Sequence, residues 1–511
     1  MKMRKAAVAL AAAAMLAGCS AGSGSDGETT GSGGTPSGNG QASTESLAVG
    51  LVAEPANLDF TKTEGAAIAQ ALLVNVYEGL VELDQDGEIV PALAKSWTIS
   101  DDRKTYTFEL VEGATFTNGE PFTAEDAKFS IERVMSDDWT ISIKTAMDVV
   151  DTVEATSPTE LVVTLKQPSN DWLFRMTTRI GAMFSRTGVD DLANKPVGTG
   201  PYQLEKWTRG DSIKLVRNES YWDEPPYFEE VTLKYFKDPT ALNNALLTGS
   251  INVIGTVQTP ESIGQFENNE KYQVIEGTTN GEVVLAFNNG SGPLTDKLVR
   301  QAVRHAIDHQ ALVDTCWAGR GQLIGSMVPS TDPWYEDLTD LFPHDVEKAE
   351  QLLQQSGKSD QALRLRVPSL PYAVSCGQVV KSQLEQAGFT VELDELEFPA
   401  AWLETVFTNA DYDMSIVAHV EPRDMPAVFG NPEYYTRYDN PKLSALFSKA
   451  DQGTEEEQIT YMKQAARMLS EDAAADWLFV IPNLVVADAD ITGLPENAIS
   501  ESFDLTTLAR S

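Results

Sequence analysis

The stretch from residue 196 to residue 249 decides the fold of this chain. It opens with GTGPY at residues 198–202 and continues through NESYW at residues 218–222. Alternating apolar side chains, separated by a Gly-Asp turn and a Pro-Pro break, predict three short strands. A helix is expected next, with Thr240 as its N-cap and Gly249 as its C-cap. The stretch therefore predicts a small antiparallel meander that leads into a helix.

Length and charge limit the class of protein. A chain of 511 residues is too long for one hydrophobic core and suggests two to four domains. The hydrophobic content of 42% is that of an ordinary soluble protein. The formal net charge of −38 repels nucleic acid and anionic lipid, so neither is an expected partner.

The N-terminus predicts a secreted, lipid-anchored protein. Basic residues precede an apolar run at residues 6–17, and the motif LAGC at residues 16–19 overlaps the end of this run and finishes with Cys19. This pattern resembles the signal peptides of bacterial lipoproteins, so we expect a signal peptide at residues 1–18 and lipidation of Cys19. Residues 19–45 are rich in Gly, Ser and Thr and predict a flexible linker to the anchor.

The rest of the chain alternates between strand and helix patterns. An α+β region is expected before the meander, and an α/β region with alternating strands and helices after it. The predicted elements are a strand at 46–52, a helix from 65, a hairpin at 81–89, a strand at 105–110, a helix from 123, strands at 149–153 and 161–165, a strand at 283–287, a helix at 299–307, a helix at 345–357, a strand at 363–367, a helix at 379–388, a strand at 390–396, a strand from 412, helices from 440 and at 454–469, and a strand at 484–487.

Several motifs in this order resemble one known family. PANLD and YEGL open the body of the chain, GTGPY and NESYW occupy the meander, and RQA and AID lie in the helix after residue 298. Their order and spacing resemble the extracytoplasmic solute-binding proteins of peptide and nickel ABC importers, family 5. The resemblance extends from about residue 47 to the C-terminus.

The resemblance implies an α/β, two-lobed fold of the type II periplasmic-binding-protein kind, with an additional small α+β domain inserted in the first lobe. We expect lobe I to contain residues 46–77, 186–285 and 480–511. The inserted domain would contain residues 78–185, and lobe II residues 286–479.

The resemblance also implies a function. The chain would be the substrate-binding lipoprotein of an ABC importer, would capture an oligopeptide by hinge closure, and would deliver it to a membrane permease with its ATPase subunits. A nickel-chelate or other small-solute receptor of the same family is an alternative, and a secreted peptidase or other hydrolase is another. We expect a monomer outside the cytoplasmic membrane, no enzymatic activity and no cofactor.

Motifs for catalysis or metal binding are weak. The only G-x-S-x-G match lies across the predicted lipidation site, where no strand and helix surround it. His305 and His309 stand four residues apart in a predicted helix and could in principle share a metal. Because that helix resembles a structural one in the family, no metal site is expected.

The candidate ligand contacts follow a predicted strand near residue 416. A loop after a strand of an open α/β sheet is a common ligand site. In peptide-binding relatives an acidic residue before a proline in this loop holds the α-ammonium of the ligand. By that match Asp424 is the first candidate and Glu421 the second, while Arg423 would pair with them or bind a carboxylate. His419 is the candidate contact for a metal chelate.

Three more residues are candidates, and one position departs from the family. Trp402 could form an apolar wall of the cleft, although a lone aromatic residue is as readily part of a core. Glu64, in the loop before the first helix, and Asn288, after a predicted strand, are expected at the cleft. Some dipeptide-binding relatives carry an arginine before a Pro-Tyr pair, whereas this chain has Leu370 there, which speaks against a free dipeptide.

Cys316 and Cys376 are the only cysteines besides Cys19. Outside the membrane two cysteines commonly form a disulfide, but their distance in space cannot be read from the sequence. The sequence therefore leaves two alternatives for this pair, a disulfide or two free thiols.

Overall fold

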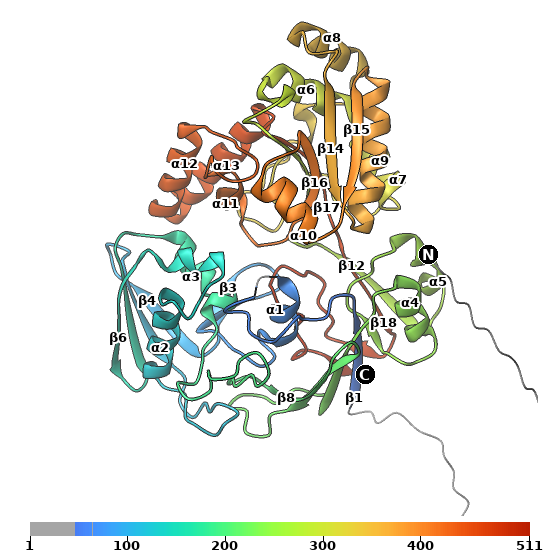
Figure 1. The fold of residues 1–511 in the computed structure, drawn as a ribbon. Helices are drawn as coiled ribbons and strands as arrows, with labels where there is room; N and C mark the ends of the chain where they lie inside the picture. Colours follow the sequence, from blue (N-terminus) through green and yellow to red (C-terminus); the bar gives the residue numbers. More distant parts are fainter. Residues whose placement is uncertain (1–45, 64) are drawn as a thin grey trace, which may run out of the picture. The chain divides into compact units, whose positions relative to one another are not determined.

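The computed structural model describes residues 46–63 and 65–511 (Figure 1). The predicted signal peptide, Cys19, the linker up to residue 45 and Glu64 lie outside these residues. Within the described part, the strands form sheets of seven, five and four strands and two ribbons of two strands. No helix in these ranges combines the length and the apolar character that a membrane crossing needs.

The seven-stranded sheet contains the predicted meander. Its strand order is β12-β18-β11-β1-β10-β9-β8, and the consecutive strands β8, β9 and β10 pair antiparallel. The central strand β1 runs parallel to β10 and β11, and β18 pairs with β11 and β12. The strands are β1 (Ser46–Leu51), β8 (Tyr202–Thr208), β9 (Ser212–Arg217), β10 (Glu230–Tyr235), β11 (Val253–Ile254), β12 (Tyr272–Gly277) and β18 (Asn483–Asp488).

The helix after the meander, α4 (Pro239–Leu247), begins earlier than predicted. Asp238 is its N-cap rather than Thr240, because the Asp238 carboxylate accepts a hydrogen bond from the backbone N–H of Ala241 at 2.7 Å. Pro239 occupies the first turn, where its missing N–H has no helical partner to lose. Gly249 follows the end of the helix at φ 71°, a left-handed conformation that glycine adopts without strain.

The GTGPY motif is explained by close contact with the segment after the first helix, α1 (Ala66–Leu72). A Cβ atom on Gly198 would lie 1.9 Å from the carbonyl oxygen of Val76, so only glycine fits there. The backbone N–H of Gly200 donates to that same oxygen at 3.0 Å. The side-chain amide of Asn218 donates to the carbonyl of Gly200 at 3.0 Å, which ties the second motif of the meander to the first.

The four-stranded sheet has the order β4-β5-β7-β6, with every neighbouring pair antiparallel. Helix α2 (Ala124–Met135) packs on β6 and β7. Aromatic side chains such as Phe108 and Trp172 are buried in a core that continues under the seven-stranded sheet. The strands and neighbouring elements are β4 (Ala94–Ile99), β5 (Thr105–Leu110), β6 (Val150–Ser157), β7 (Glu160–Leu165), η1 (Ser142–Met147), α3 (Asn170–Arg175), η2 (Arg179–Gly181) and the ribbon of β2 (Val81–Leu83) and β3 (Ile89–Pro91).

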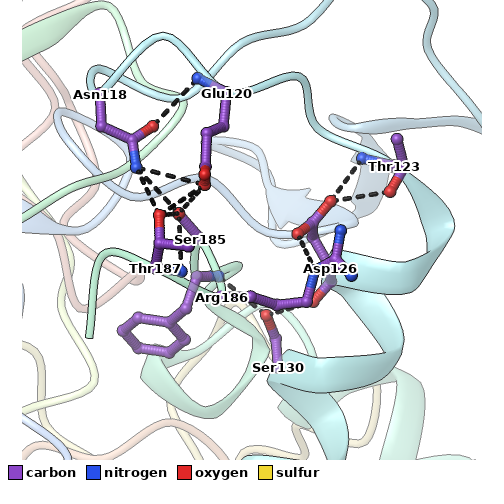
Figure 2. A network of polar contacts seen from close by, with 9 residues as sticks. Asn118, Glu120, Thr123, Asp126, Ser130, Ser185, Arg186 and Thr187 are labelled. Atoms are coloured by element: carbon purple, nitrogen blue, oxygen red, sulfur yellow. Dashed lines mark hydrogen bonds and ion pairs between the residues drawn. The ribbon is translucent and has the colours of Figure 1, made fainter. Parts of the chain in front are cut away.

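A polar network fixes the start of α2 (Figure 2). The backbone N–H and the hydroxyl of Thr123 both donate to Oδ2 of Asp126, at 3.0 and 2.8 Å, so aspartate fills the role that glutamate or glutamine usually has in a capping box. Arg186 donates to the other carboxylate oxygen at 2.8 Å. Glu120 accepts from the hydroxyls of Ser185 and Thr187, both at 2.7 Å. Asp126 thus ties Arg186 to the helix, and Glu120 ties Ser185 and Thr187 to the loop before it, so the role of both carboxylates is structural.

The five-stranded sheet has the order β15-β14-β16-β13-β17. Its strand β13 is buried on both faces, because Val283 and Leu285 enter one hydrophobic core and Val284 enters another. Helices α6 to α9 contribute to the first core and α11 to α13 to the second. The elements are β13 (Glu282–Phe287), β14 (Ala362–Pro368), β15 (Thr390–Leu396), β16 (Met414–His419), β17 (Ala475–Val480), α6 (Lys297–Ala306), α7 (His309–Cys316), α8 (Val346–Ser356), α9 (Pro371–Gln386), α10 (Ala400–Trp402), η6 (Leu403–Thr408), α11 (Met425–Phe429), α12 (Pro441–Gln452) and α13 (Glu455–Glu471).

The single helix predicted at residues 299–307 is in fact followed at once by a second one. Helix α6 ends at Ala306 and α7 begins at His309, because the Asp308 carboxylate accepts from the backbone N–H of Ala311 and caps the new helix. His305 and His309 therefore belong to different helices. His305 contacts the carbonyl of Pro343 at 2.9 Å, and the described residues contain no cluster of side chains suited to a metal ion.

Cys316 at the end of α7 and Cys376 in α9 form a disulfide.

The remaining elements are short. The short elements are α5 (Gly264–Glu267), η3 (Pro260–Ser262), η4 (Pro293–Thr295), η5 (Thr339–Leu341) and the ribbon of β19 (Ile491–Thr492) and β20 (Ala509–Arg510).

Candidate functional site

A cavity of about 460 Å³ lies where the seven-stranded and five-stranded sheets are joined. In the described chain two segments connect these sheets, one between β12 and β13 and one between β17 and β18. Thr279 to Gly281 of the first segment line the cavity, and so do Ile481 and Pro482 of the second, followed by Asn483 at the start of β18. The two segments are bonded to each other, since Thr279 Oγ1 donates to the carbonyl of Ile481 at 2.7 Å. A ligand in this cavity would touch both connections.

Most of the cavity wall is apolar. Val257 and Phe503 belong to the side of the seven-stranded sheet, and Trp317, Leu370 and Phe398 to the side of the five-stranded sheet. The side chain of Phe398 remains 37% exposed, whereas Trp317 is only 5% exposed. The size of the cavity and its mainly apolar wall with a few polar groups are typical of a site for a small molecule or a short peptide.

The arginine in the cavity wall is already paired. Arg179, at the start of η2, forms an ion pair with Glu501 in the C-terminal segment, and both side chains are almost fully buried. Arg179 Nε donates to Oε1 of Glu501 at 2.7 Å, and the Arg179 backbone N–H donates to Oε2 at 2.7 Å. Nη1 of Arg179 donates to the carbonyl of Gly65 at 3.1 Å. This guanidinium therefore has little capacity left for a ligand carboxylate.

Glu421 brings a carboxylate to the cavity from the loop after β16. The residue is partly accessible to water, but the protein around its carboxyl group excludes enough water to raise the pKa of Glu421. The nearby carboxylate of Asp424 raises this pKa further. Within the described residues no side chain donates a hydrogen bond to Glu421, so its carboxylate is available to a ligand.

Asp424 and His419 lie behind Glu421 rather than in the cavity wall. Both are buried, and Nδ1 of His419 lies 3.3 Å from Oδ2 of Asp424. Nε2 of His419 lies 2.9 Å from the hydroxyl of Tyr435, so both ring nitrogens have partners inside the protein. Glu282, the first residue of β13, is close to Asp424. Burial raises the pKa of Glu282 well above its usual value, and the nearby carboxylate of Asp424 adds to the rise.

Arg423 points away from the cavity. Its guanidinium stacks on the rings of Phe174 and Trp334, with its central carbon 3.8 and 4.9 Å from their centroids. It also pairs with Asp332 at 3.5 Å. Burial raises the pKa of Asp332 to about 6, although Arg423 opposes the rise.

Trp402 and Asn288, two further candidates, lie in the core of the five-stranded sheet region. The indole N–H of Trp402 donates to the hydroxyl of Ser415 at 3.1 Å. The side-chain amide of Asn288 donates to the carbonyls of Ala410 and Tyr412 at 2.9 and 3.1 Å. Neither residue lines the cavity, because both are used to join buried backbone segments.

Sequence reasoning missed Arg179, Glu501 and the whole C-terminal wall of the cavity. Arg179 and Glu501 are 322 residues apart, and neither stands in a motif. Neither residue follows a predicted strand end, since the nearest predicted strands end at residues 165 and 487, so no local signal was available. Residues 495–504 have no strand or helix pattern, so nothing in the sequence placed them beside the first helix.

Most of the chain matches the sequence model of one protein family. Residues 88–440 match the model of the bacterial extracellular solute-binding proteins, family 5. The chain belongs to this family. The resemblance inferred from the motifs is thereby confirmed.

Relatives within family 5 bind different solutes. The nickel-binding periplasmic protein of Escherichia coli (strain K12) is 30% identical over 348 residues, which cover 62% of this chain and 65% of that protein. The glutathione-binding protein GsiB of Salmonella paratyphi A is 28% identical over 298 residues, which cover 57% of this chain and 58% of GsiB. The chain thus spans somewhat less than two thirds of the length of these two relatives.

Solved structures confirm the fold of this family 5 member. The periplasmic binding protein DppA from Helicobacter pylori, in complex with the peptide STSA, superposes with a TM-score of 0.80 at 22% identity. The match covers 91% of this chain and 98% of DppA. The predicted α/β, two-lobed fold of the type II binding-protein kind is therefore confirmed.

Proposed function

We propose that this chain is the substrate-binding component of an ABC importer and that it captures an oligopeptide for delivery to a membrane permease and its ATPase subunits. The observation that carries the proposal is the position of the cavity, which is lined by both segments that join the two large sheets. A solute bound there would contact both lobes at once. Its binding energy would then favour a closed arrangement over an open one.

Glu421 is the direct polar contact in this proposal. Its carboxylate reaches the cavity and has no donor from another described side chain, so the amino group of a peptide would supply the missing hydrogen bonds. Asp424, the first candidate from the sequence, would not touch the ligand but would add negative charge next to Glu421. His419 would hold Asp424 in place. Arg423 would fix the loop through Asp332.

A nickel-chelate receptor is the second candidate, because a nickel-binding relative is among the most similar proteins. The two ring nitrogens of His419 are engaged with Tyr435 and Asp424, which weighs against direct nickel ligation by this imidazole. Mass spectrometry under non-denaturing conditions, with nickel and free histidine added, would distinguish a bound chelate from a bound peptide.

The proposal includes no catalysis, since the solute is carried unchanged. A panel of short peptides incubated with the protein should be recovered intact by chromatography. Cleavage that persists through purification and is lost with a cavity variant would instead establish a hydrolase.

Export and lipid anchoring complete the proposal. The LAGC pattern before Cys19 supports a lipidated N-terminus that holds the protein outside the cytoplasmic membrane, as a monomer. Labelling of growing cells with radioactive palmitate should mark the protein, and Cys19→Ala should abolish the label. An unlabelled wild-type protein would contradict this part.

The first test is identification of the natural solute. The full chain is purified without added ligand and denatured, and the released small molecules are analysed by mass spectrometry. Peptides of defined length are expected. Release of a metal chelate would favour the second candidate. If nothing is released, and neither peptides nor nickel with histidine raise the melting temperature, the receptor function itself is refuted.

A further inference from the structure

The indole N–H of Trp317 is a buried donor without an acceptor. The residue is 5% exposed, and no described residue accepts a hydrogen bond from its Nε1. The indole N–H groups of Trp139 and Trp477 are also unpaired, but these two rings lie in hydrophobic cores, whereas Trp317 lines the cavity of about 460 Å³. An unpaired buried donor destabilises a fold, and a ligand oxygen that reaches Trp317 would remove this cost.

The hydroxyl of Tyr372 is a second donor in the cavity wall. It accepts a hydrogen bond from the backbone N–H of Ala418 at 2.9 Å, and within the described chain no group accepts the hydrogen of the hydroxyl itself. Burial raises the pKa of Tyr372 to about 12, so the hydroxyl keeps its proton at neutral pH. The bond that it accepts polarises the O–H group and makes it a stronger donor.

The disulfide brings these two donors close to each other. Trp317 follows Cys316 directly, and Tyr372 stands four residues before Cys376 in α9. The two cysteine Cα atoms are 5.0 Å apart, and residues four apart in a helix project from the same face. Both side chains can therefore approach one group of a ligand from two helices that the disulfide joins.

The wall next to the two donors has no available cation. Leu370, Phe398 and Val417 are its apolar members on the side of the five-stranded sheet. Arg179 is the single lysine, arginine or histidine among the described lining residues, and it is paired with Glu501. A ligand oxygen placed at Trp317 and Tyr372 would therefore be held by neutral donors.

The opposite side of the cavity has neutral donors as well. Gln70 in α1 and Gln258 after β11 both line it, and neither NH2 group donates to another residue of the described chain. A side-chain amide both donates and accepts, so these residues match the C=O and the N–H of an amide group. A ligand with several amide groups could thus form hydrogen bonds with both sides.

We propose that Trp317 and Tyr372 form a subsite for an oxygen acceptor of the solute, a carbonyl or a carboxylate, which they bind through neutral hydrogen bonds. This inference rests on the proposed receptor function. Nε1 of Trp317 is covered by protein atoms, so its bond forms when the indole ring turns toward the cavity that it borders. One oxygen has two lone pairs and can accept from both donors. The fitting solute carries this oxygen next to an apolar group, which packs on Leu370 and Phe398.

Nuclear magnetic resonance of the full chain with isotope-labelled tryptophan tests the contact directly. The chain has nine tryptophans, so the indole spectrum is simple, and Trp317→Phe identifies one signal by its loss. Saturating trileucine should move the indole proton of Trp317 downfield, because a new hydrogen bond deshields it. The indole protons of Trp139 and Trp477, which lie in the cores, should move far less.

Two variants measure the contribution of each donor by isothermal titration calorimetry with trileucine. Tyr372→Phe removes only the hydroxyl, and Trp317→Phe removes the N–H with part of the ring. Each should weaken binding about tenfold. The control Trp97→Phe makes the same change of ring in β4, outside the cavity wall, and should leave the affinity unchanged. Because Tyr372→Phe also takes a partner from Ala418, melting temperatures must show that the variants are folded.

Titration with trileucine amide separates the two sources of the oxygen. If Trp317→Phe weakens binding of the free acid and not of the amide, the subsite holds the C-terminal carboxylate. If it weakens both ligands equally, the subsite holds a neutral carbonyl. Either result supports the inference.

The inference is overturned if trileucine binds without moving the Trp317 signal, or if neither cavity variant weakens binding. It is also overturned if trileucine and its amide fail to bind while another solute is recovered from the purified protein, in which case the receptor function stands. If no solute is recovered and neither ligand binds, both the inference and the receptor function fall.

Discussion

At the scale of one residue, the buried carboxylate of Glu78 links stability to pH. The hydroxyl of Tyr221 donates to its Oε1 at 2.9 Å, and the indole N–H of Trp222 donates to its Oε2 at 3.0 Å. These two aromatic residues come from the NESYW motif, so the motif closes over the carboxylate. Burial nevertheless raises the pKa of Glu78 to about 7, although the nearby side chains of Thr199, Trp222 and Tyr221 oppose the rise.

We predict that Glu78 destabilises the protein as the pH rises. The folded-state pKa is above the unfolded value, so the stabilising contribution is complete below about pH 4.5 and is lost as the pH rises through about 7. Between about pH 5 and pH 8, the free energy of unfolding of Glu78→Gln should fall by roughly 2 kcal/mol less than that of the wild type. Urea denaturation at several pH values measures this difference.

The matched control is Glu88→Gln, which removes an exposed carboxylate of the nearby hairpin loop. Its pH dependence should follow the wild type. Glu82 also contributes to the pH dependence of the wild-type stability. Burial raises its pKa to about 7, and the carboxylates of Asp504 and Glu78 add to the rise. Parallel curves for Glu78→Gln and the wild type would contradict the prediction.

A second residue, Asp476, holds a buried charge pair. Its carboxylate lies 3.0 Å from Nε of Arg304 and 3.0 Å from Nε2 of His309, and it is completely buried. Asp476→Asn would leave the Arg304 guanidinium buried without a counter-charge, so we expect a loss of roughly 3 to 5 kcal/mol in the free energy of unfolding. Guanidinium or urea unfolding of both proteins measures the loss.

The comparison variant for Asp476 is Glu471→Gln, at the exposed end of α13. A surface charge of this kind contributes little, so its effect should stay below about 1 kcal/mol. Similar, small effects of both substitutions would show that the buried pair contributes no more than a surface one.

At this scale the sequence predicted the site only in part. Glu421 was reached through the resemblance of its loop to peptide-binding relatives, and it lines the cavity. Trp402 and Asn288 were wrongly expected at the cleft. In the sequence, an aromatic ring or an amide near a strand end has the same pattern whether it lies in a cleft or in a core. Arg179 and Glu501 were out of reach, since an ion pair over 322 residues leaves no local pattern.

At the scale of elements, the disulfide joins two helices that contribute to the same side of the cavity. Cys316 ends α7, and the next residue, Trp317, lines the cavity. Cys376 lies in α9, which begins beside Leu370 and carries Tyr372, two further lining residues. The bond therefore constrains the apolar side of the cavity as well as the fold.

We predict that loss of this disulfide costs stability. It closes a loop of 60 residues, for which the loop-entropy model gives roughly 4 kcal/mol. The double variant Cys316→Ala, Cys376→Ala should lose about this much in urea denaturation. Reduction of the wild type should give the same curve, and denatured, unreduced protein should show neither thiol. Two titratable thiols at these positions would refute the prediction.

Elements with a regular pattern were predictable, and breaks between helices were not. Strands β8 to β10 follow from strict alternation of apolar side chains and from turns such as the one at Gly210, which has φ 78°. The break between α6 and α7 was missed. Asp308 is compatible with the interior of a helix, and only the folded chain shows that it caps a new one.

At the scale of the whole molecule, contacts outside the lining of the 460 Å³ cavity connect the four-stranded sheet region to α12. Oδ1 of Asp451, near the end of α12, accepts from the hydroxyl of Ser169 at 2.7 Å and from the backbone N–H of Asp171 at 3.1 Å. The side-chain amide of Asn170 donates to the carbonyls of Ala450 and Gly453. These contacts border a second cavity of about 420 Å³.

If the protein closes around its solute as proposed, these contacts would stabilise the closed arrangement. Asp451 is the centre of the group, because it accepts two hydrogen bonds from the start of α3. Charged acceptors of this kind typically contribute about 1.5 to 3 kcal/mol. A ligand must then supply less free energy to close a protein that retains Asp451 than one that lacks it.

We therefore predict that Asp451→Ala weakens solute binding by about tenfold or more without altering the cavity itself, and that the dissociation rate rises. Small-angle X-ray scattering of the solute-free variant should give a larger radius of gyration than the wild type, and saturating solute should remove the difference. Glu456→Ala, an exposed substitution at the start of α13, provides the control. Unchanged scattering together with unchanged affinity would mean that Asp451 holds a contact that persists in the open protein, because a contact present in both states cannot shift the balance between them.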